Sequence, residues 1–372
     1  MLSVARKGDA CELTPDARRE VLATTKSPFQ GNSLYLPCGR ILFKSGKYSA
    51  DRECLLMLVR QRFHSFEEYA ASLGHGDVSV LALKRARLRW ESARIDLDGV
   101  PVRWARDGGP CVFEGAIDLD VVGLMVCVAA TGKMIGNGTA FGPGSVMVVP
   151  RAHQIRVTSL DAVEWISVLI PTSRLCRTAA EQRALRVLPC GVIDPPLVAR
   201  PTFRAALMRI AMAAMTGAFD ANSLGQIDAS ERLVEAARTL LGAAPESPVV
   251  QTHAGRRRIS RVGIIRLVER WLEDEADRRP SLHDLARAAG VSHRTLHNAF
   301  AEQLGVSPKR FLRLRLLNAV RRELTCASCD DLQVTDVVSR LGVWDWGRFS
   351  GEYWALFGEL PSETLRRTRR RR

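Results

Sequence analysis

The sequence predicts an α+β chain with several domains, in which a β-rich N-terminal half precedes a helical connector and an all-α C-terminal domain. Between residues 76 and 170, short stretches of alternating apolar residues are separated by turns rich in glycine and proline. From Ser173 onwards the apolar residues recur at three- and four-residue spacing, which is typical of helices. Residues 282–365 then repeat a pattern of helix, turn and longer helix.

The β-rich half is predicted from strand-like alternation and one strong hairpin signal. Asp98 and Gly99 separate two alternating apolar runs, and both central residues of a type I′ turn need positive φ. Further strands are expected at 78–82, 121–128, 145–149, 154–157 and 163–169. Many short strands joined by such turns favour a β-sandwich or a small barrel.

The helical connector has two interpretations. Helices are expected at 173–185, 202–218 and 230–241, and their apolar faces suit pairing with a second subunit as well as packing on the sheet of their own chain. We divide the chain into a poorly patterned segment, a β-rich domain, the connector, a linker, a helical domain and a basic tail, with boundaries at 1–60, 61–172, 173–243, 244–258, 259–366 and 367–372.

The C-terminal domain contains an internal repeat. Residues before the turn match at an offset of 52 and residues after it at an offset of 53, as in Leu285 with Val337, Gly290 with Gly342, Phe300 with Tyr353, Gly305 with Gly358 and Pro308 with Pro361. Gly290 and Gly342 are predicted to make the two turns, because glycine adopts backbone angles denied to other residues. Ser292 and Asp345 are predicted N-caps of the two longer helices, and Ser281 with Asp284 starts the first short helix.

The exposed face of the first longer helix carries hydrogen-bonding groups. With Leu296, Phe300 and Leu304 on the buried stripe, the opposite face presents His293, Arg294, His297 and Asn298. In the major groove of DNA a guanidinium can bind guanine O6 and N7, and a carboxamide can bind adenine in the same two-point way. We therefore predict that this face contacts bases or the DNA backbone; the alternative is an ordinary solvated helix face.

A helix predicted at residues 309–324 connects the two repeats. It would be about 24 Å long, and a rigid connection of that size can hold two reading helices in adjacent major grooves, ~34 Å apart. Its arginines are predicted to supply charge for the phosphates, although Arg315 is equally suited to an ion pair inside the domain: Arg310, Arg313, Arg315, Arg321 and Arg322. Most of the net charge of +14 lies in the C-terminal region, because residues 256–372 hold 24 Lys and Arg against 15 Asp and Glu.

Both repeats and their separation resemble the C-terminal DNA-binding domain of AraC-family regulators, over about 100 of the 372 residues. The motifs that carry the resemblance are Ala289-Gly290-Val291-Ser292, Gly305-Val306-Ser307-Pro308, Gly342-Val343, Phe357-Gly358 and Pro361-Ser362. Residues 294–300 and 317–324 are similar in texture to the ethanolamine-operon regulator subgroup, whose effector we do not carry over.

The resemblance implies a transcription regulator, usually an activator, with a cupin-like effector or dimerisation domain at its N-terminus. Its partners would be double-stranded DNA, RNA polymerase, a small-molecule effector and, as an open alternative, a second copy of the chain. The family's contact positions fall on Arg294, His297 and Asn298 in the first repeat. In the second repeat the exposed positions are expected to be Trp346, Gly347, Arg348 and Gly351, beside the N-cap Asp345. Each glycine weakens a helix by ~1 kcal/mol relative to alanine, so we expect the second unit to read fewer bases.

Cysteine and histidine usage gives no metal site. The nine cysteines are scattered, Cys326 and Cys329 form a C-x-x-C without two further ligands, and His153 is isolated. We therefore expect no metal and no cofactor. No segment has the length and hydropathy of a membrane helix, and no signal peptide begins the sequence, so the expected location is the cytoplasm.

Two other functions compete with regulation. Some alkylation-repair proteins join an AraC-like half to methyl-accepting cysteines, but their Pro-Cys-His run is replaced here by Pro37-Cys38-Gly39 and Pro189-Cys190-Gly191, so no enzyme is expected. A nonspecific architectural DNA binder would show a steep salt dependence without sequence discrimination. Three tryptophans of the β-rich half suit either an effector pocket or, as we favour, simple core packing: Trp90, Trp104 and Trp165.

Overall fold

A computed structural model of the chain gives the fold. It describes residues 33–35, 41–43, 59–63, 65–73, 78–117, 119–130, 134–151, 153–186, 188, 190–194, 200–216, 223–242, 259–275, 280–326 and 332–370. Most of the segment 1–60 and all of the predicted linker 244–258 therefore lie outside the described residues. Within the described part, no helix combines the length and the apolar character needed to cross a membrane.

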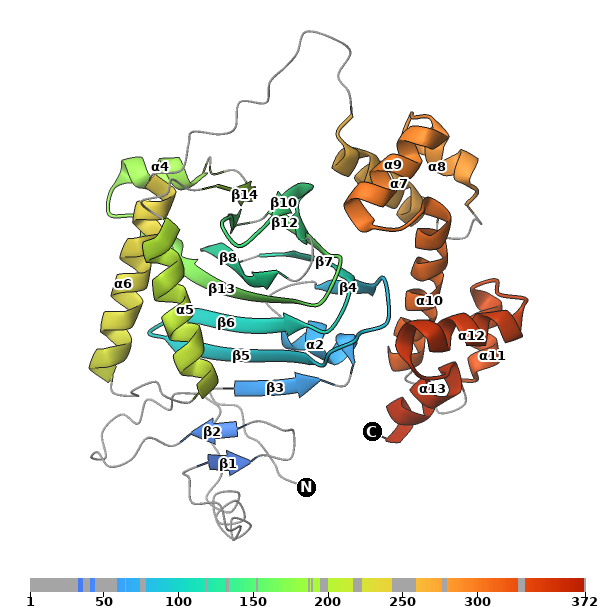
Figure 1. Ribbon diagram of the computed structural model, residues 1–372, viewed down its shortest axis with the longest axis horizontal. Helices are drawn as coiled ribbons and strands as arrows, with labels where there is room; N and C mark the ends of the chain where they lie inside the picture. Colours follow the sequence, from blue (N-terminus) through green and yellow to red (C-terminus); the bar gives the residue numbers. More distant parts are fainter. Residues whose placement is uncertain are drawn as a thin grey trace.

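The N-terminal half is built from two antiparallel sheets that face each other (Figure 1). The larger sheet has the order β14-β11-β8-β13-β6-β5-β3, with β3 at Val59–Phe63, β5 at Trp90–Leu97, β6 at Val100–Asp107, β8 at Val121–Ala130, β11 at Val146–Val149, β13 at Val163–Pro171 and β14 at Gly191–Ile193. The smaller sheet has the order β10-β9-β12-β7-β4, with β4 at Ser79–Ala82, β7 at Cys111–Ala116, β9 at Met134–Gly136, β10 at Thr139–Phe141 and β12 at Gln154–Ser159. A separate pair joins β1 (Ser33–Tyr35) to β2 (Ile41–Phe43).

The predicted hairpin is confirmed. Strands β5 and β6 pair antiparallel, and Asp98 and Gly99 between them have φ of 52° and 76°. Asp98 tolerates this conformation because a short polar side chain carries a small penalty there. The other predicted strands are also found, as β4, β8, β11, β12 and β13, and the predicted α+β fold class is confirmed.

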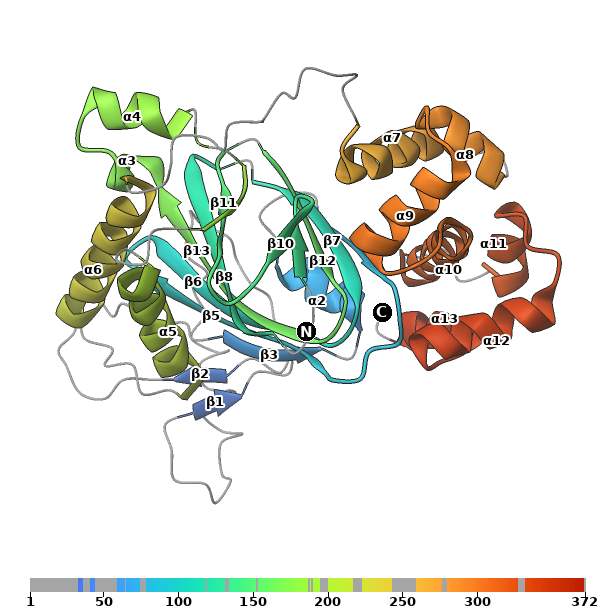
Figure 2. The same cartoon turned by 45° about the horizontal axis from the view of Figure 1, so that its top comes forward.

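Helices of the connector cover the outer face of the larger sheet. Helix α5 (Arg200–Thr216) contacts β5, β6 and β13, and it packs against α6 (Ser223–Gly242). Its buried residues Phe203 and Leu207 share a core with Trp104 and Ile166 of the sheet. These apolar faces therefore pack on the chain's own sheet, and Figure 2 shows both helices on the side of the β-domain away from the C-terminal helices.

The single helix predicted at 173–185 is wrong. Two short helices are found instead, α3 (Thr172–Leu175) and α4 (Ala179–Arg186). Cys176 has an extended backbone, which ends α3. The Thr178 hydroxyl then accepts a hydrogen bond from the backbone N–H of Glu181 at 3.2 Å, which starts a new helix. The apolar spacing continues through residues 173–185, so it predicted one helix and gave no sign of this cap.

The C-terminal half is helical, and its internal repeat is confirmed. A leading helix α7 (Arg261–Asp274) precedes α8 (Leu282–Ala288) and α9 (His293–Leu304), then α10 (Pro308–Cys326), α11 (Val334–Arg340), α12 (Trp346–Phe357) and α13 (Pro361–Arg370). The pairs α8/α11 and α9/α12 keep the offsets of 52 and 53 residues. Gly290 and Gly342, with φ of 62° and 73°, occupy equivalent left-handed positions in the two turns. Extra length in the second turn accounts for the change of offset.

One hydrophobic core runs through both halves of the molecule. Tyr69 and Trp90 of the β-domain belong to the same buried cluster as Phe300, Phe311 and Tyr353 of the helical half. The contact is made by α2 (Phe66–Ser72) and β4, with β4 beside α10. Figures 1 and 2 both show α10 as the strut between α9 and α12.

Candidate nucleic-acid interface and ligand pocket

Helix α9 presents the predicted polar face to solvent. The Ser292 hydroxyl accepts from the backbone N–H of Thr295 at 3.2 Å and so caps the helix. Leu296, Ala299 and Phe300 turn into the shared core. The predicted site residues of this helix are exposed together on the opposite face: His293, Arg294, His297 and Asn298. All four therefore lie on one uncovered helix face.

Helix α12 is capped in the same way, but one of its predicted contact residues is partly covered. The Asp345 carboxylate accepts from the backbone N–H of Arg348 at 3.0 Å. Trp346, predicted to be exposed, packs partly against the shared core. The prediction missed Trp344, whose exposed fraction of 75% is unusual for so large an apolar side chain. Gly347, Arg348 and Gly351 are exposed, as predicted.

A carboxylate that sequence reasoning missed, Glu352, gathers three of the predicted phosphate-binding or base-binding arginines. The nitrogen–oxygen distances are 2.6 Å for Arg313, 3.0 Å for Arg348 and 3.9 Å for Arg310. Burial opposes ionisation of Glu352, but hydrogen bonds from Arg313 and Arg348 hold its pKa below the usual range. These arginines are therefore held in place by a common acid on α12 rather than being free. The spacing of four residues between Arg348 and Glu352 is typical of an ion pair on one helix face, and it could have predicted this contact.

The remaining arginines of α10 divide into exposed and buried groups. Arg322 is exposed. Burial lowers the pKa of Arg315, an effect opposed by Glu269 and Glu273, in line with a role inside the domain. Arg321 was predicted to supply charge for DNA, and this prediction is wrong, because its side chain is only 4% exposed. It pairs instead with Glu67 of α2, and with Glu359 at 2.8 Å.

Contacts of α10 with the β-domain are specific as well as apolar. The Asn318 side chain donates to the carbonyl of Ala82 at 3.1 Å and accepts from the Ala82 N–H at 3.0 Å. Ala82 lies on β4 at the edge of the smaller sheet, so a side-chain amide satisfies backbone groups that would otherwise be unpaired. A second polar contact joins β12 to α7, where Arg156 donates to Glu269 at 2.9 Å.

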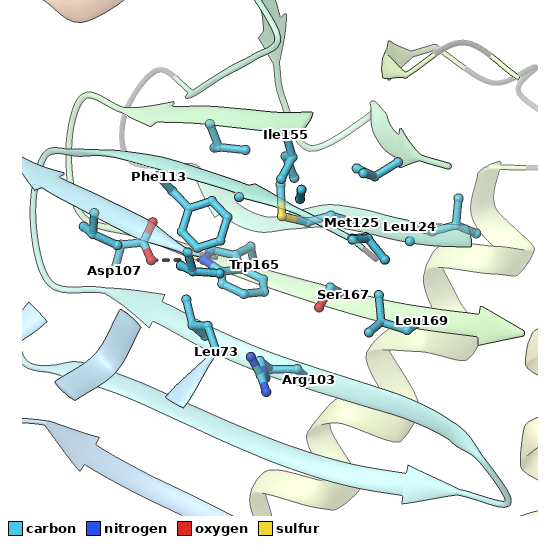
Figure 3. Close-up of a pocket in the computed structure, with 18 of the residues that line it drawn as sticks. Leu73, Arg103, Asp107, Phe113, Leu124, Met125, Ile155, Trp165, Ser167 and Leu169 are labelled. Atoms are coloured by element: carbon cyan, nitrogen blue, oxygen red, sulfur yellow. Dashed lines mark hydrogen bonds between the residues drawn. The ribbon is translucent and has the colours of Figure 1, made fainter. Parts of the chain in front are cut away.

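A pocket lies inside the β-domain, between its two sheets (Figure 3). Its volume is about 130 Å³ and its walls are largely apolar, with Phe113, Ile155 and Leu169 among them. Of the three tryptophans, Trp165 lines the pocket, whereas Trp90 and Trp104 are buried in separate hydrophobic cores. Polar side chains in its lining include Arg94, Arg103, Asp107, Tyr69 and Ser167.

Asp107 ties one end of the pocket to α2. Its carboxylate accepts from the Tyr69 hydroxyl at 2.7 Å, from the Ser159 hydroxyl at 3.0 Å and from the Trp165 indole at 3.1 Å. Burial raises the pKa of Asp107, against the effect of these three donors, and burial together with Asp107 raises the pKa of Tyr69 well above its usual range. The network therefore connects a pocket wall to the helix that packs on the C-terminal half.

Within the described part of the chain, the cysteines form no metal centre, and burial raises the pKa of the Cys111 thiol. Among the residues that the structure describes, no group of three His, Cys, Asp or Glu side chains could hold a metal ion, and Cys329 lies outside them. Cys38 also lies outside the described residues. Burial raises the pKa of Cys190, although a hydrogen bond from Asn137 opposes this effect, so that thiol is a poor nucleophile at neutral pH.

Comparison with known proteins bears on the C-terminal half. Residues 285–367 match a family model described as a helix-turn-helix domain, and this range runs from within α8 through α10 to the end of the second repeat. The helices of this segment are arranged as two helix-turn-helix motifs. The XylDLEGF operon transcriptional activator of Pseudomonas putida is 36% identical to the chain over 103 residues, which are 28% of this chain and 32% of that protein. The probable thc operon regulatory protein of Rhodococcus erythropolis is 38% identical over 104 residues, which are 28% of this chain and 31% of that protein.

The chain thus spans about a third of the length of the curated relatives that it matches. Among solved structures, the AraC-like transcriptional activator CuxR aligns with 76% of this chain and 99% of its own, at 13% identity and a TM-score of 0.40. The relatives of the helix-turn-helix domain are transcription regulators. The resemblance to the ethanolamine-operon subgroup stays a prediction.

Proposed function

We propose that the chain is an AraC-family transcription regulator that binds a specific DNA sequence in two adjacent major grooves and activates transcription in response to a small molecule. The observation that carries the proposal is the duplicated helix-turn-helix unit, in which the second helix of each repeat has an exposed face, polar on α9 and carrying Arg348 on α12. The names of the relatives matched by the helix-turn-helix domain support activation. In this proposal residues 61–172 bind the effector, 173–243 connect or dimerise, and 259–366 bind DNA.

In the first repeat, the proposed base-reading group is the exposed face of α9. Arg294 and Asn298 have the side-chain geometry for two-point recognition of guanine and adenine, with His297 and His293 beside them. Helix α10 has 19 residues and is about 28 Å long, which suits a spacing of one turn of duplex. Arg322 and Arg310 would neutralise phosphates between the two grooves.

In the second repeat, proposed contacts depend on fewer side chains. Arg348 and Arg313 share Glu352, which would hold their guanidinium groups ready for the backbone or a base edge. Trp344, Asp345 and Trp346 lie at the start of α12, where a helix end enters the groove. The exposed indole of Trp344 would gain contact area on binding.

Effector control would pass from the pocket to α10. The Asp107–Tyr69 hydrogen bond joins the pocket wall to α2, and α2 pairs with α10 through Glu67 and Arg321. A ligand that favours one arrangement of this contact would change the freedom of the helix-turn-helix domain to fit DNA. We further propose that the chain contacts RNA polymerase, that a second copy of the chain is an additional partner, and that the chain works in the cytoplasm.

The proposal predicts different effects for a base-reading and a phosphate-binding arginine. Arg294→Ala should weaken binding to a duplex selected from a random library by about 1–3 kcal/mol, and should relax preference at one base position. Arg322→Ala should weaken the selected and a scrambled duplex alike, and should lower the salt slope by about 1. Fluorescence anisotropy titrations at several salt concentrations measure both quantities.

Arg209→Gln is the matched control, because Arg209 is an exposed arginine on α5, within the connector. It should leave both affinities unchanged. Equal loss on the selected and scrambled duplexes for Arg294→Ala would contradict base reading by α9. Failure to select any preferred duplex would favour the architectural binder instead.

A further inference from the structure

Two arginines face the pocket from adjacent strands. Arg94 of β5 and Arg103 of β6 are directly opposite each other in the antiparallel register, and Ser167 of β13 is opposite Arg103 on its other side. All three line the pocket. They therefore form one polar row across the larger sheet, and Figure 3 shows Arg103 and Ser167 in the largely apolar pocket.

This pair of guanidinium groups has no counter-charge among the described residues. Neither the Arg94 nor the Arg103 side chain has an ion pair or a hydrogen bond within the part of the chain that the structure describes. Like charges directly opposite each other in a sheet are destabilising. Burial, reinforced by Arg94, lowers the pKa of Arg103 to about 10, so the group is still protonated at neutral pH but poorly solvated.

Asp107, the acid of the pocket lining, does not neutralise them. It lies four residues along β6 from Arg103, so about 13 Å separates the two backbone positions. Its oxygens are already engaged by Tyr69, Ser159 and Trp165. The pocket consequently has a cationic row at one end and a saturated carboxylate at the other.

The space between these ends is apolar and small. Phe113, Met125, Ile155 and Leu169 form its walls. A volume of about 130 Å³ is close to that of an engineered cavity of ~150 Å³ that binds benzene. The body of a ligand that fills it would therefore have about six carbon atoms.

We propose that this pocket binds a small monocarboxylate with an apolar body of about six carbons, whose carboxylate is bound by Arg103 and Arg94 while Ser167 donates a hydrogen bond. The planar guanidinium fork matches the two oxygens of a carboxylate, and a charge-assisted bond gains strength in an apolar surrounding. The anion would also relieve the repulsion between the two arginines. The inference deepens the proposed function, because it gives the chemical class of the effector, but binding itself needs no DNA.

Acids and their neutral isosteres test the carboxylate directly on the full chain. Hexanoate and cyclohexanecarboxylate should raise the thermal midpoint in a concentration-dependent way, whereas hexanamide and cyclohexanecarboxamide should bind at least about tenfold more weakly. Inorganic phosphate, an anion without an apolar body, should give no stabilisation above that of chloride at equal ionic strength. Isothermal titration calorimetry gives the affinities.

Variants locate the binding groups. Arg103→Gln should weaken binding of the acids by at least about tenfold and leave binding of the amides unchanged, with a smaller loss for Arg94→Gln. Arg209→Gln, on the exposed face of α5, should bind like the parent chain. If Arg103→Gln does not fold, Arg103→Lys keeps the charge without the fork and should bind the acids with intermediate affinity.

Several results would overturn the proposal. They are equal binding of acids and amides, unchanged acid binding in Arg103→Gln, or no binding of any acid to the parent chain. The DNA titrations separate this failure from failure of the proposed function. Specific DNA binding without acid binding would reject the monocarboxylate alone, and acid binding without a preferred duplex would reject the regulator while leaving the pocket assigned.

Discussion

Asn318 shows how one side chain fixes the relation between two distant parts of the sequence. Its carboxamide donates to and accepts from the backbone of Ala82, 236 residues earlier, and it also donates to the carbonyl of Leu314 at 2.8 Å. The groups are buried, so each lost bond would leave an unsatisfied donor or acceptor away from water. A residue on the predicted DNA-binding connector therefore serves the contact between domains.

We predict that Asn318→Ala lowers the free energy of unfolding by about 1–3 kcal/mol, because the N–H and C=O of Ala82 lose their partner. Urea denaturation followed by circular dichroism measures the change. Asn298→Ala is the matched control on α9, and because that side chain is exposed its effect should stay within about 0.5 kcal/mol. An Asn318→Ala effect as small as that of the control would mean that water replaces the amide at this contact.

Helices α9 and α12 have the same length and are capped in the same way, but they differ in helix propensity. Both have 12 residues, and each ends at a left-handed glycine, Gly305 or Gly358. Only α12 contains glycine inside the helix, at Gly347 and Gly351, and a Cβ at either position would meet nothing within 4 Å. Steric crowding within the chain thus gives no reason for these glycines. Under the proposed function, close approach of a DNA backbone would give such a reason.

We predict opposite effects for two glycine substitutions in the helix-turn-helix domain. Gly351→Ala should stabilise the chain by about 0.5–1 kcal/mol, because alanine loses less conformational entropy in a helix. Gly290→Ala should destabilise it by roughly 1–2 kcal/mol, because φ of 62° is unfavourable for a residue with a Cβ. Thermal unfolding of both variants measures the pair, and the same sign for both would contradict the αL assignment or the helical one.

At the scale of the molecule, the β-domain and the helix-turn-helix domain share a buried junction. The Arg321 guanidinium lies 5.3 Å from the ring centre of Phe66 in α2 and 4.4 Å from that of Phe357 in α12, with Glu67 and Glu359 as its ion-pair partners. A buried ion pair is costly to break on one side, because the remaining charges lose their partner. The junction therefore couples the folding of α2 to that of α10 and α12.

We predict that Arg321→Met speeds amide hydrogen exchange by about tenfold in α2 and β4 as well as in α10, because the loss of one group opens the contact from both sides. Mass spectrometry of peptides from each element measures the rates. Arg340→Met is the control, since Arg340 pairs with Glu323 in an exposed position on the helical half. Faster exchange confined to α10 would show that the two halves open independently.

The sequence by itself determined the elements whose cause is local. The Asp98-Gly99 hairpin, the repeat at offsets of 52 and 53, its turn glycines and the exposed face of α9 follow from backbone preferences and apolar spacing along one stretch of chain. The break between α3 and α4 was missed because a single cap outweighed continuous apolar spacing. The Thr178 cap is also a local feature, but a single side-chain hydrogen bond is not visible in the apolar pattern from which the helix was predicted.

Only the tertiary structure decided which polar residues face solvent and which face each other. Arg321 and Arg322 are neighbours in sequence, yet one is buried between two aromatic rings and the other is exposed. Arg94 and Arg103 meet because β5 and β6 pair in one register, and the pocket exists because a second sheet covers that face. Such groupings depend on long-range packing, in which burial and partners hundreds of residues away set the state of each charge, so no local pattern could reveal them.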